Sequence, residues 1–235
     1  MINKNAIDRY DGINYVDIGK LKMSDITHKY EHCEIKWHKL LMLVDISSKS
    51  KKFPTLVIEK ENKFYLLKQT TTFLLNRHLR KEQFLHECRN HSIAKYLNVR
   101  QKQPFVTSCA SFVPLTAKKK SRTHSWINVD LVSFEQLIGM HKKVLLNDCT
   151  GSLPLAVNTT INYLIGKLDD TRRMKEYTLH EFLVHRKDIE RLMHQSHRSR
   201  DMTSQSPIAF DGELMDKIGR EMAKMLLERD TDLDD

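Results

Sequence analysis

The chain has 235 residues, of which 40% are hydrophobic and 29% charged, so it can bury a core of its own without disulfide bonds. Seven Gly and five Pro argue against long flexible linkers and Gly-rich phosphate loops, and the longest apolar run, at about residues 40–44, is far shorter than the roughly 18 residues of a membrane span. The formal net charge is +9, which bears on the partners of the protein rather than on its fold.

The first half of the chain predicts mostly β-structure. Residues 1–32 are polar and give no clear pattern, whereas Glu61 and Asn62 separate two short apolar runs and predict a hairpin turn. Residues 79–97 are predicted to form a helix, and residues 118–124 a basic loop without apolar side chains. The predicted strands of the whole chain are 34–46, 55–58, 64–67, 105–110, 112–115, 126–132, 144–147 and 153–157.

The C-terminal third predicts helices. Asn158 or Thr159 caps a short predicted helix that ends near Leu168, and a capping box of Thr178 with Glu181 opens the next one. The remaining predicted segments are a helix at 178–194, a Ser-rich linker at 198–207, an amphipathic helix at 211–229 and an acidic tail at 230–235.

These segments predict an α+β fold, with mainly antiparallel strands and hairpins in the first two-thirds and helices packed on the sheet and at the C-terminus. Residues 1–168 are predicted to form an α+β domain, 169–229 a helical C-terminal region and 230–235 a disordered tail. Four widely spaced cysteines and a polar N-terminus without a signal-peptide pattern predict a cytoplasmic protein with reduced thiols and no membrane partner.

Two histidine pairs have the residue type, but not the spacing, of metal ligands. His180 and His185, like His86 and His91, are five residues apart, which places them about 140° apart around a helix, too far to hold one ion. No CxxC pair, nucleophile elbow, phosphate loop or dinucleotide motif is present. The sequence therefore predicts no metal, no cofactor and no enzymatic activity.

The strongest feature is the basic window, which we define as residues 77–124. It holds eleven Lys and Arg against two Glu, which equals the whole net charge of +9. A charge run is most often a solvated face, but an ordinary surface mixes both signs. We therefore predict nucleic-acid binding, in which each Lys or Arg on a phosphate releases counterions. The residues assigned to phosphate or minor-groove contacts are Arg77, Arg80, Lys81, Lys118, Lys119, Lys120 and Arg122.

A series of short motifs runs from about Glu59 to Leu168. In order, they are Phe64-Tyr65, Arg77, Arg80-Lys81, Lys95, Phe112-Val113-Pro114-Leu115-Thr116, Trp126-Ile127, Asn147, Leu153-Pro154 and Asn158-Thr159-Thr160-Ile161-Asn162. In order and spacing this segment resembles the ComK family of competence transcription factors. It departs from the family at Leu79, where relatives tend to have Gly.

The resemblance implies a bacterial transcriptional activator of DNA-uptake genes. Such proteins bind paired A/T-rich boxes as dimers and tetramers, mainly through the minor groove and with DNA bending. The resemblance further implies association with the nucleoid, and contact with a proteolytic adaptor or with RNA polymerase.

Two other functions are open at this point. The basic window could meet an acidic protein partner, with the predicted helix 211–229 as an interaction element. An RNA-binding protein or a nuclease is the third hypothesis. RNA readers usually carry exposed aromatic platforms, whereas here Trp126 stands alone near the basic loop and is predicted to pack beneath it. A nuclease needs clustered carboxylates for metal, and the basic window has almost none.

Overall fold

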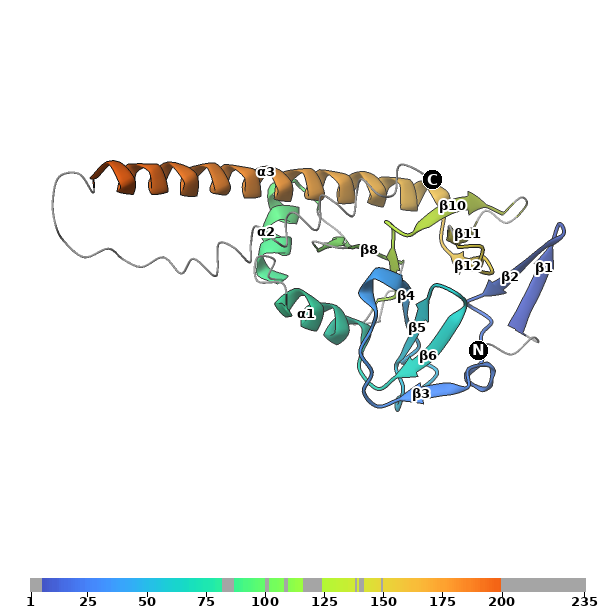
Figure 1. The fold of residues 1–235 in the computed structure, drawn as a ribbon. Helices are drawn as coiled ribbons and strands as arrows, with labels where there is room; N and C mark the ends of the chain where they lie inside the picture. Colours follow the sequence, from blue (N-terminus) through green and yellow to red (C-terminus); the bar gives the residue numbers. More distant parts are fainter. Residues whose placement is uncertain are drawn as a thin grey trace. The chain divides into compact units, whose positions relative to one another are not determined.

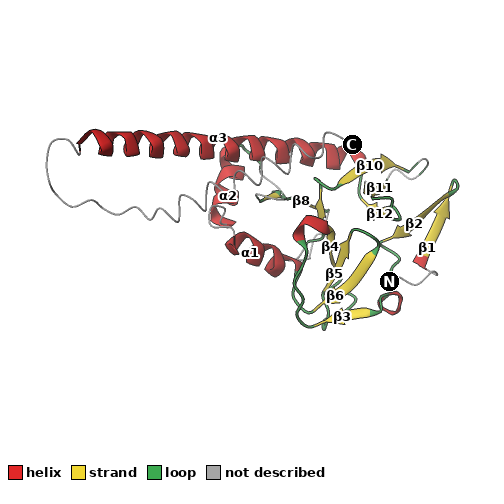
Figure 2. Ribbon diagram, in the orientation of Figure 1, coloured by secondary structure: helices red, strands yellow, loops and turns green. Residues whose placement is uncertain are grey.

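The computed structural model describes residues 6–81, 87–99, 102–107, 110–115, 124–137, 139, 142–148 and 150–199. Within these residues the chain has the predicted α+β fold, with two mainly antiparallel sheets and three α-helices (Figures 1 and 2). The chain divides into two compact units, Met1–Leu179 and His180–Asp235. All described strands belong to the first unit.

A seven-stranded sheet forms the centre of the first unit. Its order is β3-β6-β5-β4-β9-β8-β7, and all neighbours are antiparallel except β3 and β6. The strands are β3 (His28–Tyr30), β4 (Leu40–Asp45), β5 (Thr55–Glu59), β6 (Lys63–Leu67), β7 (Phe105–Val106), β8 (Ser111–Pro114) and β9 (Trp126–Asn128).

A five-stranded sheet has the order β1-β2-β12-β11-β10, in which only β12 and β2 are parallel. Its strands are β1 (Ile7–Tyr10), β2 (Ile13–Asp17), β10 (Val132–Gln136), β11 (Lys143–Asp148) and β12 (Leu155–Asn158). Residues 1–32, which gave no clear pattern, therefore supply strands to both sheets.

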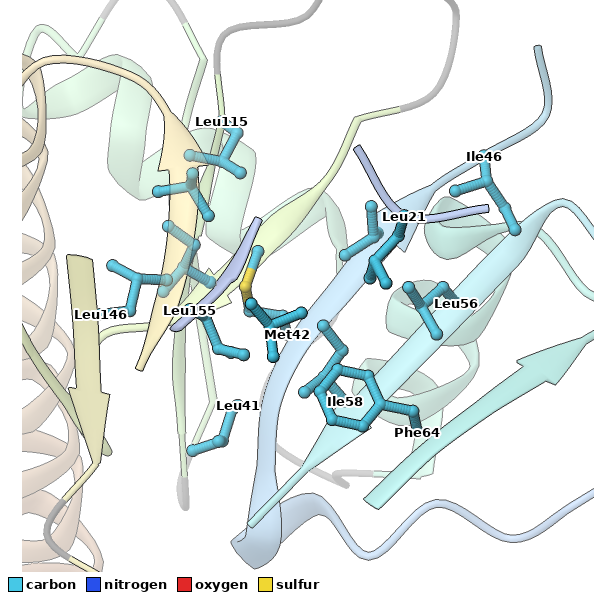
Figure 3. Packing of buried hydrophobic residues seen from close by; sticks show 14 of the residues in the cluster. Leu21, Leu41, Met42, Ile46, Leu56, Ile58, Phe64, Leu115, Leu146 and Leu155 are labelled. Carbon is cyan, nitrogen blue, oxygen red and sulfur yellow. The ribbon is translucent and has the colours of Figure 1, made fainter. Parts of the chain in front are cut away.

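The two sheets pack on each other through what we call the sandwich core (Figure 3). Met42, Ile58 and Phe64 of the seven-stranded sheet and Leu146 and Leu155 of the five-stranded sheet belong to this one buried cluster, with Met42 beside Leu155. The opposite face of the seven-stranded sheet carries a second group, the helix-side core. Its buried members are Ile35, Leu40, Leu43, Val57, Tyr65, Leu67, Leu74, Leu75, Ala110, Phe112 and Trp126.

Strand β4 shows how the sequence serves both cores. Met42 and Val44 belong to the sandwich core, and Leu43 between them belongs to the helix-side core, because successive side chains of a strand point to opposite faces. Leu41 also joins the sandwich core, since the pairing of β4 with β5 shifts register between Leu40 and Met42. A strand buried on both faces reads as a continuous apolar run.

The hairpin predicted around Glu61 and Asn62 is confirmed. Strands β5 and β6 pair from Thr55 with Leu67 to Glu59 with Lys63. Three residues, Lys60, Glu61 and Asn62, connect the paired strand ends, and the last two have φ of 63° and 54°, in the left-handed region, which three-residue hairpin loops also use. Asn is among the residues that adopt it most readily.

The predicted helix 79–97 is wrong in its extent. The structure has α1 (Thr71–Lys81) and α2 (Glu87–Tyr96). Helix α1 begins eight residues earlier than predicted, in a run of β-branched Thr residues with low helix propensity. Tertiary packing overrides that propensity, because Leu74 and Leu75 of the first turns are buried in the helix-side core.

The two predicted helices around 158–168 and 178–194 are one helix, α3 (Ile161–Ser199), without a break at Thr178 (Figure 2). Thr178 Oγ1 donates to the carbonyl of Met174 at 2.8 Å, as a residue inside a helix does. Met174 is buried with Ile93 of α2, so packing holds the helix there. The cap is Thr160, whose Oγ1 accepts from the amide of Tyr163 at 3.3 Å.

Some predicted strands are shorter than expected. Of residues 34–46, Trp37–Lys39 form a short 3-10 helix and only β4 is a strand. Residues 126–132 divide at a turn, so that β9 joins one sheet and β10 the other. The predicted linker, terminal helix and acidic tail, at 198–207, 211–229 and 230–235, lie outside the described residues apart from the end of α3. No described helix is long and apolar enough to span a membrane.

Candidate nucleic-acid interface

Helix α1 is the described element that carries the predicted contact residues Arg77 and Arg80. Its start is fixed by Thr70, whose Oγ1 accepts from the amide of Phe73 at 3.3 Å and whose carbonyl accepts from the amide of Leu74 at 3.1 Å. This is the usual role of a Thr at the N-cap position. These two hydrogen bonds fix where the helix begins and therefore which residues lie on each of its faces.

One face of α1 is buried against the seven-stranded sheet (Figure 1). Leu75 and Leu79 are each 0% exposed and Leu74 is nearly so. His78 stacks on Trp37 with ring centroids 3.9 Å apart and planes 4° apart. The three leucines and the ring stack determine which side of the helix can face a partner.

The opposite face carries what we call the α1 stripe: Phe73, Arg77 and Arg80. All three side chains are exposed, and Phe73 is 53% exposed. Residues at i, i+4 and i+7 lie on one side of a helix, so the aromatic ring and both guanidinium groups face the same way. Neither arginine has an ion-pair or hydrogen-bond partner among the residues that the structure describes.

The base of the basic loop is fixed beside the start of α1. Thr71 Oγ1 donates to the carbonyl of His124 at 2.7 Å, and the amide of Leu115 donates to the carbonyl of Ser125 at 2.8 Å. The predicted contact residues Lys118, Lys119, Lys120 and Arg122 lie between these anchors and outside the described residues. The structure thus brings both ends of this loop to the helix that carries the α1 stripe.

The remaining cations of the basic window differ in their surroundings, and some lie outside the described residues. The side chains of Lys81 and Arg89, and all of Arg100, lie outside the described part of the chain. Lys95 is exposed on α2. Lys102 lies with its Nζ 5.4 Å from the ring centroid of Tyr163, a cation–π contact.

Tyr163 forms a fixed support near Lys102. Its hydroxyl donates to the carbonyl of Pro114 at 2.6 Å. Burial, together with the negative charge of Asp170, raises the pKa of Tyr163 to about 12, so the phenol stays protonated at neutral pH. A neutral ring keeps the negative π-face that attracts the Lys102 ammonium.

Trp126 is buried, whereas the loop beneath which it was predicted to pack lies outside the described residues. Trp126 is 4% exposed and meets Phe105 edge to face, with ring centroids 4.8 Å apart. It is therefore part of the helix-side core and does not face a partner. Its indole Nε1 is buried and has no hydrogen-bond partner among the residues that the structure describes.

Phe73 is the site residue that sequence reasoning missed. Its spacing from Arg77 and Arg80 was readable, but the predicted helix began at residue 79 and left Phe73 outside it. One member of each histidine pair, the side chain of His185 and all of His86, lies outside the described residues. Among the described residues, no three His, Cys, Asp or Glu side chains come together as metal ligands.

Comparison with protein-family models, with curated proteins and with solved structures finds no match to this chain.

Proposed function

We propose that the protein binds double-stranded DNA and that the α1 stripe and the adjoining loop 116–123 form its contact surface. The observation that carries the proposal is the pair of exposed arginines on a helix whose other face is fully packed. Both arginines lie on the helix whose first residue, Thr71, holds His124 by a hydrogen bond, and the sequence just before His124 contains four further cations and no acid. Such a surface matches the phosphate backbone in charge.

The preferred DNA is A/T-rich, and the preferred approach is through the minor groove. A/T tracts have a narrow minor groove with enhanced negative potential, into which arginine and lysine insert. The minor groove displays mainly the difference between A·T and G·C. A surface of arginines and lysines with few specific hydrogen-bonding groups is sufficient for that distinction.

The biological role that we propose follows from the resemblance to the ComK family. On that basis the protein is a bacterial transcriptional activator of DNA-uptake genes, acting in the cytoplasm at the nucleoid. It binds paired boxes as a dimer or tetramer. The resemblance supports this role, whereas the α1 stripe supports DNA binding independently.

The test is binding of the full chain to two matched duplexes, one with paired A/T-rich boxes and one with G/C substitutions, at several salt concentrations. We expect the A/T duplex to bind tighter by about a thousandfold or more at physiological salt. Equal binding to both, lost as salt rises, would reduce the basic window to general charge attraction. An acidic protein or an RNA would then be the partner to seek.

A further inference from the structure

We propose that Phe73 is a wedge that inserts at a base-pair step of the minor groove while Arg77 and Arg80 hold the flanking phosphates. This inference rests on the proposed DNA binding and adds a mode of recognition to it. Apolar side chains inserted between base steps unstack them partially and kink the duplex toward the major groove.

The orientation of Phe73 is set by its neighbours in the chain. Leu74 and Leu75 are buried beneath α1, and successive residues of a helix are about 100° apart. Phe73 therefore cannot turn into the core without removing a leucine from it. Its amide is also fixed by the hydrogen bond to Thr70. The burial of the two leucines and the hydrogen bond to Thr70 therefore keep the Phe73 ring exposed to solvent.

Single exposed hydrophobic residues are common on protein surfaces. Whether Phe73 has a binding role is therefore judged from the charges of the residues around it. Ile165 on α3 is a useful comparison, because it is 51% exposed and Phe73 is 53% exposed. One turn after Ile165 stands Asp169, whereas one turn after Phe73 stands Arg77. A carboxylate there repels a phosphate, and a guanidinium binds one. Of these two exposed residues, Phe73 is the one with a cation, rather than an acid, one turn later.

The spacing of the α1 stripe fits the groove. With a rise of 1.5 Å per residue, Phe73 and Arg80 are roughly 10 Å apart along the helix axis, and the minor groove is roughly 6 Å wide. The arginines can therefore reach the phosphates that border the groove while the ring meets the bases. Pyrimidine–purine steps such as TA are easily unstacked, so an A/T-rich site lowers the cost of insertion.

The experiment uses an A/T-rich duplex with 2-aminopurine at a TA step, whose fluorescence rises when it is unstacked. The full chain is compared with Phe73→Ala, Phe73→Trp and the matched control Ile165→Ala. We expect fluorescence to rise with the unaltered chain, Phe73→Trp and Ile165→Ala. With Phe73→Ala the rise is lost and Kd increases by about tenfold, within the range of base–aromatic stacking, while the salt dependence stays unchanged.

Two results would overturn the proposal, and they can be told apart. If Phe73→Ala binds as tightly as the unaltered chain with the same fluorescence, the wedge is wrong and DNA binding by the arginines stands. If the unaltered chain binds neither the A/T nor the G/C duplex, the proposed function fails and the wedge fails with it. Circular dichroism of each variant shows that it is folded, as expected for exposed positions.

Discussion

Arg77 and Arg80 are expected to act through charge, and charge has a signature in the salt dependence of binding. Each phosphate neutralised contributes about 0.9 to the slope of log K against log salt. The double variant Arg77→Gln and Arg80→Gln should therefore lower that slope by about two and weaken binding to all sequences. Fluorescence anisotropy at several salt concentrations measures both quantities.

The matched control is Arg172→Gln. Arg172 is also an exposed helical arginine, but its side chain lies 3.9 Å from Asp169 and 3.8 Å from Glu176. Acidic neighbours compete with phosphate, so this variant should leave the slope unchanged. An equal loss of slope in both variants would show that the contribution is not specific to the α1 stripe.

Asp148 should make the stability of the fold depend on acid pH. Its carboxylate accepts from the amides and the hydroxyls of Thr150 and Ser152. Burial opposes ionisation, but these hydrogen bonds outweigh it and hold the pKa of Asp148 below its ordinary value. Because the folded-state pKa is lowered, the stabilisation is present above about pH 4 and is lost as the pH falls through the folded pKa.

Asp148→Asn should therefore lower the free energy of unfolding at pH 7, and the difference from the unaltered chain should shrink as the pH falls below about 4. Urea unfolding at a series of pH values measures this. A difference that stays constant over the whole range would mean that the charge of Asp148 contributes nothing and that only its shape matters.

The candidate site could be predicted from residue identities only in part. Arg77 and Arg80 were assigned to DNA contacts because clustered cations are visible in the sequence, and the structure exposes both side chains on α1. Phe73 was missed, since its role depends on where α1 begins, and that start is decided by Leu74 and Leu75 packing on strands distant in the chain. Propensity alone disfavours a helix through three consecutive threonines.

At the scale of elements, the β5–β6 turn connects the two sheets. The amide of Leu153 donates to Asn62 Oδ1 at 2.9 Å, and the amide of Glu61 donates to Ser152 Oγ at 3.1 Å. Leu153 and Ser152 belong to the segment between β11 and β12. The turn thus connects β5 to β6 and also joins the seven-stranded sheet to the β11–β12 connection of the five-stranded sheet.

Two substitutions at Asn62 separate these roles. Asn62→Gly keeps the left-handed backbone and removes the hydrogen bond to Leu153, so it should cost about 1 kcal/mol. Asn62→Ala removes the same hydrogen bond and keeps a Cβ without the polar side chain that lets Asn adopt the left-handed region, so it should cost about 1–2 kcal/mol more than Asn62→Gly. Chemical denaturation ranks the variants. If Asn62→Ala is as stable as Asn62→Gly, residue 62 does not hold a positive φ.

Local elements were predicted better than long-range ones. The hairpin 55–67 is confirmed because its turn chemistry and its apolar runs are adjacent in the sequence. The single helix α3 was predicted as two, since the capping-box pattern at Thr178 is also compatible with a helix interior. The parallel pairings β2–β12 and β3–β6 join segments that are distant in the sequence, so a local sequence pattern cannot predict them.

At the scale of the first compact unit, the seven-stranded sheet is shared by two cores. Its strands place residues such as Met42 toward the five-stranded sheet and Leu43 toward α1. A layer buried on both faces couples what lies on either side, because neither core can be lost without exposing the sheet between them. We therefore expect this unit to unfold in one cooperative transition.

Leu146→Ala tests this coupling. Leu146 is 1% exposed in the sandwich core, so the variant should lose about 2–5 kcal/mol of stability. Both tryptophans of the chain, Trp37 and Trp126, lie at the helix-side core, in the other layer. If the layers are coupled, tryptophan fluorescence and far-UV circular dichroism shift to the same lower urea midpoint in this variant. If tryptophan fluorescence keeps the midpoint of the unaltered chain, the helix-side core that supports the α1 stripe folds independently of the sandwich.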